Sequence, residues 1–243
     1  MTTVIKRPPA QTFLPTNPLC VALDSTDRVE IDRIAEATYE HVGVFKVGLM
    51  TFIAHGRDLV GELAARRPVF LDLKLHDIPA QVAGAVLGAA DTGASFVTVH
   101  ASGGHDMLRA AAENAPDGLA VLAVTILTSL DEGSMRAVGL AGPPESAVLR
   151  LAELALGAGA DGLVCSPLEV AAVRKRFGSA AEGGPVLVVP GIRSAADARG
   201  DQRRTLGAAE AVDAGADVIV VGRPIYESPD PAAAAAALAA EVA

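Results

Sequence analysis

Eight short apolar runs, most of them separated by Ala- and Leu-rich stretches with helical spacing, recur along this chain. Hydrophobicity within each run is continuous rather than alternating, which is typical of strands covered on both faces, as in a parallel sheet. Strands that alternate with helices in this way predict an α/β fold. The runs are residues 19–23, 44–47, 69–73, 96–99, 120–125, 162–165, 186–189 and 218–221.

The number of strand and helix units favours one closed barrel. No shift in composition along the 243-residue chain marks a linker between two domains. Single barrels of this kind typically occupy about 250 residues. The sequence therefore predicts a single (β/α)8 TIM barrel over residues 18–243, preceded by an N-terminal arm of residues 1–17, with a doubly wound open sheet as the alternative.

Capping residues mark the expected ends of the first and last helices. Ser25 or Asp27 can cap a helix that runs to about His41. Asp230 can cap a final Ala-rich helix that has Pro231 in its first turn. We expect this last helix to close the outer ring of the barrel.

The composition limits the partners that the protein can have. Hydrophobic residues make up 51% of the chain, enough for a sizeable core, and the formal net charge is −9. This charge argues against a broad surface for nucleic acid or an anionic membrane, so an anionic ligand has to be held by a local site. No apolar run has the length of a signal sequence or a membrane span, and we expect a cytoplasmic protein. Cys20 and Cys165 lie in predicted strands and are expected to be buried thiols.

The third run contains charges that a core strand has no packing reason to carry. Residues 70–79 read Phe-Leu-Asp-Leu-Lys-Leu-His-Asp-Ile-Pro. Because side chains alternate along a strand, Asp72 and Lys74 share one face, and the leucines share the other. A buried ion pair is seldom better for stability than apolar packing. These charges therefore indicate a chemical site, with a structural ion pair as the alternative.

Polar residues also follow the other predicted strands, at the end where a TIM barrel places its active site. Scattered surface charge has no reason to keep that position at every strand. In strand order, these residues are Asp24; Lys46; Asp72 and Lys74; His100; Thr125, Thr128 and Ser129; Ser166; Arg193; and Arg223.

Two lysines and several carboxylates around one cavity predict an alternating array of charges. Opposite charges favour the charged form of each group, so Lys74 can remain an ammonium and act as a general acid. Asp72 then acts as an acceptor. A Schiff-base role for Lys74 is the alternative, but it needs a neutral amine, which adjacent carboxylates oppose.

The loops after the seventh and eighth runs have the composition of an anion site. Gly191 and Gly222 let backbone amides approach an anion, while Arg193 and Arg223 supply forked donors. Loops at these positions are the usual phosphate site of TIM barrels. The segment 200–204, Gly-Asp-Gln-Arg-Arg, can close over a ligand, and a solvated loop is the alternative.

Together these segments resemble the bacterial branch of the orotidine 5′-monophosphate decarboxylase family. The resemblance covers nearly all of the chain except the N-terminal arm. It implies a (β/α)8 homodimer with shared active sites that converts orotidine 5′-monophosphate to UMP and CO2 in pyrimidine biosynthesis, without a metal or an organic cofactor. Besides residues 70–79, the segments that carry it are residues 19–24, 45–48, 100–104, 124–129, 190–193, 200–204 and 222–224.

The resemblance also implies roles for the charged residues. Asp72 faces the substrate carboxylate, and Lys74 protonates C6 of the pyrimidine. Lys46 joins the charge array, and Asp77 completes the array of the neighbouring subunit. By the same resemblance, Asp24 binds the ribose hydroxyls and Thr128 contacts the base. The residues that hold the phosphate are Arg193, Gln202, Gly222 and Arg223.

One position departs from the pattern of the family. After residues 77–79 the family commonly continues Asn-Thr, and the threonine is expected to reach the ribose in the partner subunit. This chain has Ala80 and Gln81 instead. Gln81 can still donate and accept hydrogen bonds, so we expect an altered contact. His76, inside the signature, is expected to be structural.

Two other functions fit parts of the pattern. Magnesium-dependent sugar-phosphate decarboxylases and synthases resemble the chain around Asp72, but they carry an acidic residue at the end of the second strand. Lys46 stands there in this chain, and a lysine repels a metal ion. A non-catalytic nucleotide-binding barrel needs a phosphate site but has no need for the array of lysines and carboxylates.

Overall fold

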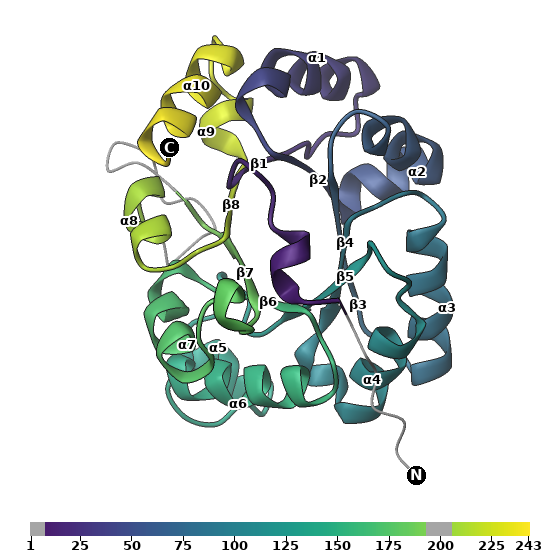
Figure 1. Ribbon diagram of the computed structural model, residues 1–243, viewed down its shortest axis with the longest axis vertical. Helices are drawn as coiled ribbons and strands as arrows, with labels where there is room; N and C mark the ends of the chain where they lie inside the picture. Colours follow the sequence, from purple (N-terminus) through teal and green to yellow (C-terminus); the bar gives the residue numbers. More distant parts are fainter. Residues whose placement is uncertain (1–7, 193–205) are drawn as a thin grey trace.

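Eight parallel strands close into one barrel in the computed structural model, which describes residues 8–192 and 206–243 (Figure 1). Each strand pairs with the next along the chain, and β8 pairs with β1. The predicted TIM barrel is confirmed, and the open sheet is excluded. The strands are β1 (Leu19–Ala22), β2 (Val44–Gly48), β3 (Val69–Leu75), β4 (Phe96–His100), β5 (Ala120–Val124), β6 (Gly162–Val164), β7 (Val186–Pro190) and β8 (Val218–Val221).

Helices surround the barrel on its outside (Figure 1). The described α-helices are α1 (Arg28–Thr38), α2 (Leu49–Ala64), α3 (Pro79–Ala90), α4 (His105–Asn114), α5 (Glu132–Ala137), α6 (Pro144–Gly157), α7 (Val170–Phe177), α8 (Ala208–Asp213), α9 (Arg223–Tyr226) and α10 (Pro231–Glu241). Short 3-10 helices are η1 (Ala10–Phe13), η2 (Tyr39–His41), η3 (Ala101–Gly103), η4 (Pro167–Glu169) and η5 (Ala180–Glu182).

Side-chain caps begin the first and last α-helices. Asp27 caps α1 by accepting a hydrogen bond from the backbone N–H of Val29 at 2.9 Å. Asp230 caps α10 in the same way through Ala233, with Pro231 as its first residue. Of the two predicted caps for α1, Asp27 is therefore correct. These local hydrogen bonds satisfy N–H groups that have no partner within the helix.

The apolar core has two layers, one inside the barrel and one between strands and helices. Phe70 and Phe96 pack edge to face inside the barrel, with ring centroids 6.3 Å apart. Leu71 and Val97, the next residues along β3 and β4, belong to the outer layer. Inward and outward side chains thus alternate on both strands, which places Asp72 on the inward face.

The described part of the predicted N-terminal arm packs against the barrel. Phe13 and Leu14 contact the inner apolar cluster, and Figure 1 shows the purple η1 segment across the barrel opening. Asn17 donates to the carbonyl of His41 at 3.0 Å and accepts from the backbone N–H of Leu19 at 2.8 Å. The domain boundary at residue 17 stays a prediction.

Both cysteines are buried thiols, as predicted. Burial raises the pKa of the Cys20 thiol far above its ordinary value, which keeps it protonated and unreactive. Within residues 8–192 and 206–243, no helix combines the length and apolar character needed to cross a membrane.

Candidate active site at the carboxyl ends of the strands

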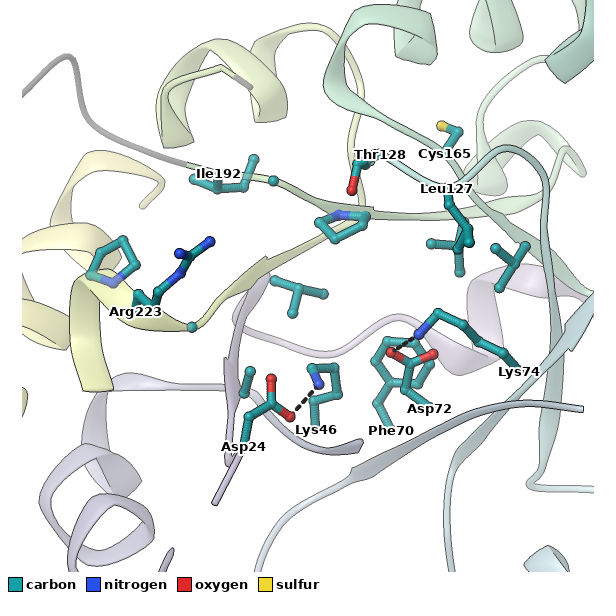
Figure 2. Close-up of a pocket in the computed structure, with 18 of the residues that line it drawn as sticks. Asp24, Lys46, Phe70, Asp72, Lys74, Leu127, Thr128, Cys165, Ile192 and Arg223 are labelled. Carbon is teal, nitrogen blue, oxygen red and sulfur yellow. Dashed lines mark hydrogen bonds and ion pairs between the residues drawn. The ribbon is translucent and has the colours of Figure 1, made fainter. Parts of the chain in front are cut away.

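A cavity of about 590 Å³ opens where the barrel strands end. Of the ten predicted site residues, the seven that line it are Asp24, Lys46, Asp72, Lys74, Thr128, Gly222 and Arg223. Arg193, Gln202 and the rest of the segment 200–204 lie outside the described residues. Figure 2 shows Asp24, which follows β1, together with Lys46 of β2 and Asp72 and Lys74 of β3 at the floor of the cavity.

Lys46 forms the first ion pair of this group with Asp24. The Lys46 ammonium donates to Asp24 Oδ1 at 2.8 Å, and its side chain is only 9% exposed. Burial by itself lowers the pKa of Lys46, but the charges of Asp24 and Asp72 and the hydrogen bond to Asp24 together raise it above its ordinary value. Lys46 is therefore a buried cation held by two carboxylates.

Lys74 and Asp72 form the second ion pair. The Lys74 ammonium donates to Asp72 Oδ2 at 2.6 Å, and Asp72 Oδ1 accepts from Thr98 Oγ1 at 3.0 Å. The ion pair considered as a structural alternative is present, but it lines a cavity instead of filling the core. Because Asp72 also acts on the pKa of Lys46, the two pairs form one electrostatic group.

The backbone of β3 is irregular where it carries these residues. Leu71 pairs with Val97 and Leu75 pairs with Val99, so Asp72, Leu73 and Lys74 all stand opposite the single residue Thr98. Among the described residues, Lys74 is the only non-glycine residue with a positive φ, at 55°. Backbone strain of this kind concentrates at functional sites.

Thr98 is a residue of the site that the sequence patterns missed. Its hydroxyl accepts from the backbone N–H of Lys74 at 2.8 Å and donates to Asp72. In the sequence it is one threonine within an apolar strand, where a β-branched residue is unremarkable. The only available signal was its inward-facing position, two residues after Phe96.

The far side of the cavity is formed by the loops after β5 and β7 and by Gly222 and the short helix α9 after β8. Arg223 and Lys74 lie on opposite sides of the cavity in Figure 2, with Thr128 on a third side. Gly191 follows β7 with φ of 88°, a conformation that other residues rarely adopt. The cavity thus lies between the Lys74–Asp72 pair and Arg223, one of the predicted phosphate residues.

Asp77 does not join the other charges in this chain. Its carboxylate is exposed and accepts from the backbone N–H of Ile78 at 2.7 Å, at the start of α3. It is not one of the residues that line the cavity as the structure describes it. Its neighbour Ile78 is also exposed, which is unusual for a large apolar side chain beside a polar site.

His76 packs beside His100, outside the cavity lining. Their ring centroids are 5.4 Å apart. Burial lowers the pKa of His100, and His76 and Lys74 lower it further against an opposing effect of Asp72. His100 is therefore neutral at neutral pH.

Comparison with known proteins agrees with this architecture. The sequence profile of the "Orotidine 5'-phosphate decarboxylase / HUMPS family" matches residues 17–238. The chain is 58% identical over 228 residues to orotidine 5'-phosphate decarboxylase of Anaeromyxobacter sp. (strain K), covering 93% of this chain and 98% of that protein. It is 52% identical over 229 residues to the enzyme of that name from Thermobifida fusca (strain YX), covering 93% and 95%.

A solved structure extends the likeness to three dimensions. The crystal structure of orotidine 5'-phosphate decarboxylase from Lactobacillus acidophilus superposes with a TM-score of 0.80 at 34% identity, covering 93% of this chain and 99% of that chain. The chain belongs to the orotidine 5'-phosphate decarboxylase / HUMPS family.

Proposed function

We propose that this protein converts orotidine 5′-monophosphate to UMP and CO2, using Lys74 as the proton donor and no metal or organic cofactor. Membership of the family and the names of its relatives support the reaction. The observation that carries the mechanism is the Lys74–Asp72 pair, set in a cavity beside the Lys46–Asp24 pair.

Protonation is the step assigned to Lys74. Loss of CO2 breaks the bond between C6 and the carboxyl carbon and leaves an electron pair on C6. The Lys74 ammonium delivers a proton to that carbon and becomes a neutral amine. Asp72 holds the donor through a hydrogen bond of 2.6 Å between opposite charges. The carboxylate of Asp72 also faces the substrate carboxylate as the bond breaks.

The remaining residues of the cavity bind the nucleotide. Asp24, which is half exposed beside Lys46, binds the ribose hydroxyls, and Thr128 contacts the base. The phosphate residues are Gly222 and Arg223, together with Arg193 and Gln202. The phosphate lies far from C6 and does not react. Its binding energy can therefore be used to orient the substrate and the catalytic residues around C6.

The proposal includes a homodimer in which Asp77 completes the charge array of the partner. The exposure of Asp77 outside the cavity of its own chain supports this arrangement. Ile78 at the start of α3 and Met50 and Ile53 on α2 add exposed apolar surface. Figure 1 shows α2 and α3 as neighbours on one side of the barrel, where a second copy can bury that surface.

The proposed partners and cellular compartment follow from the net charge of the protein and from the small anionic substrate. Substrate and product are small anions that a local site can bind despite the net charge of −9. We place the protein in the cytoplasm, with neither nucleic acid nor membrane among its partners.

The charge array argues against the two alternative functions, a magnesium-dependent sugar-phosphate enzyme and a non-catalytic nucleotide-binding barrel. A magnesium site at the end of β2 is disfavoured because the buried Lys46 ammonium occupies that position and pairs with Asp24. A nucleotide sensor has no use for two lysine–carboxylate pairs, because apolar side chains of similar volume often stabilise a fold at least as well. The decarboxylase is therefore the better account of the same residues.

The test is the loss of orotidine 5′-monophosphate absorbance, followed with and without a metal chelator. We expect the same rate in both, and no loss with a Lys74→Ala protein purified in parallel as a control for contaminating enzyme. Strict dependence on magnesium would support the metal-using relatives. Binding of UMP without any loss of absorbance would support the sensor.

A further inference from the structure

We infer that Thr98 is a positioning residue for the reaction, because its hydroxyl orients the Asp72–Lys74 pair. Thr98 lies in the middle of β4 and is completely buried. This inference rests on the proposed function for its effect on rate. Its structural part concerns only the contacts of β3 and β4.

The register of the two strands explains why a side chain is needed at this point. Three residues of β3 face Thr98 alone, so backbone pairing between the strands is interrupted there. The N–H of Lys74 donates instead to Thr98 Oγ1 at 2.8 Å. The hydroxyl thus provides the acceptor for a backbone group in a strained, left-handed conformation.

The direction of each hydrogen bond is determined by the groups involved. A backbone N–H can only donate, so the Thr98 oxygen is the acceptor toward Lys74. An ionised carboxylate can only accept, so the Thr98 hydroxyl proton points to Asp72 Oδ1 at 3.0 Å. Asp72 Oδ2 is then left for the Lys74 ammonium at 2.6 Å.

These three hydrogen bonds form a closed ring. The ring runs from the Lys74 backbone through Thr98 and Asp72 to the Lys74 ammonium. One hydroxyl therefore sets both the backbone that carries the proton donor and the carboxylate that holds it. A buried valine of similar shape would leave the Lys74 N–H and Asp72 Oδ1 without this partner.

The position of Thr98 predicts an effect on the chemical step more than on binding. The predicted phosphate and base residues, Arg223 and Thr128, lie on other sides of the cavity (Figure 2). Misplacement of a reacting group by about 1 Å can cost about 100-fold in rate. We therefore expect the loss of the hydroxyl to lower kcat while KM changes little.

The experiment compares Thr98→Val, Thr98→Ser and a matched control, Thr38→Val. Thr38 is an equally buried threonine in α1 and is not one of the residues that line the cavity; its hydroxyl donates to the carbonyl of Ile34 at 2.8 Å. We expect Thr98→Val to lower kcat by about 10- to 100-fold with KM nearly unchanged. Thr98→Ser, which keeps the hydroxyl, should restore most of kcat, and Thr38→Val should keep the wild-type value. Thr98→Ala removes the same hydroxyl if Thr98→Val does not fold.

A second measurement tests the contacts without relying on activity. Hydrogen exchange of the Lys74 amide, compared with that of Val97 and Val99, should accelerate in Thr98→Val and stay slow in Thr98→Ser. An inactive wild-type protein would overturn the proposed function, while the exchange rates would still test whether Thr98 holds the Lys74 backbone. Full kcat in Thr98→Val, failure of serine to restore it, or unchanged Lys74 exchange would each overturn the positioning role.

Discussion

The Lys74 ammonium lies 2.6 Å from a carboxylate oxygen of Asp72, although both residues belong to the same strand. Side chains two residues apart on a regular strand project in parallel, with their Cα atoms about 7 Å apart. In β3 the backbone at Lys74 turns into a left-handed conformation with φ of 55°. The ion pair and the distorted backbone are therefore parts of one arrangement that holds a cation in the cavity.

Replacing Lys74 with alanine should abolish turnover but leave nucleotide binding intact. In the proposed mechanism the ammonium acts on C6 in the transition state, whereas Arg223, a proposed phosphate ligand, lies across the cavity (Figure 2). Positioned proton donors contribute about 10²- to 10⁴-fold, so we expect kcat to fall by a factor in this range or larger. Steady-state kinetics and calorimetry of UMP binding measure the two effects. Lys175→Ala, at an exposed lysine of α7, is the matched control. Near-normal kcat in Lys74→Ala would contradict the mechanism.

The left-handed backbone at Lys74 makes a separate prediction about stability. Glycine adopts this conformation without the steric cost of a Cβ atom, which is about 1–2 kcal/mol. We therefore expect Lys74→Gly to be more stable than Lys74→Ala by about 1 kcal/mol, with both proteins inactive. Urea unfolding gives the two free energies. At Lys175, in the last turn of α7, the same pair should show the opposite order, because glycine weakens a helix. Equal stability of the two Lys74 variants would argue against strain.

Replacing Arg223 with alanine should weaken substrate use. A hydrogen bond to a charged group contributes about 1.5–3 kcal/mol, so kcat/KM should fall at least about tenfold. The kinetics of orotidine 5′-monophosphate turnover measure this loss. Arg176→Ala removes an exposed arginine of α7 that pairs only loosely with Glu153, at 3.4 Å, and should change nothing. An unchanged kcat/KM in Arg223→Ala would exclude this side chain from phosphate binding.

Mixing two inactive proteins tests whether the active site is shared. Lys74→Ala lacks the proton donor, and Asp77→Ala lacks the carboxylate that we assign to the partner's array. A heterodimer has one site in which both defects coincide and one site in which both groups are intact. We expect activity to reappear on mixing and refolding. If heterodimers are detected by mass spectrometry but activity does not reappear, Asp77 does not contribute to the active site of the partner subunit.

The buried Lys46 predicts how stability depends on pH. Its pKa is raised in the folded protein by Asp24 and Asp72, which overcome the opposing effect of burial. The stabilisation from these charges is therefore fully present below the ordinary lysine pKa of about 10.4 and is lost as pH rises through the higher folded-state value. The difference in unfolding free energy between wild type and Lys46→Met should be constant up to about pH 10 and shrink above it. A difference that already falls near neutral pH would contradict the assigned charge.

The barrel itself was predictable because its signals are local. Continuous apolar runs specify strands covered on both faces, and caps such as Asp27 and Asp230 begin helices through contacts within a few residues. All eight predicted runs agree with the observed strands to within two residues at either end. The position of charges such as Lys46 and Lys74 at strand ends followed from the same pattern, because parallel strands in a closed barrel end at one face.

The sequence by itself thus determined the architecture and the face of the barrel where the charges gather. Only the tertiary structure decided which charge pairs with which, Lys46 with Asp24 and Lys74 with Asp72. It alone revealed Thr98, because the importance of that hydroxyl depends on a register shift between two strands that are distant in sequence. Strand formation is a property of short segments, whereas hydrogen-bond partners depend on how separate segments align to within less than an ångström.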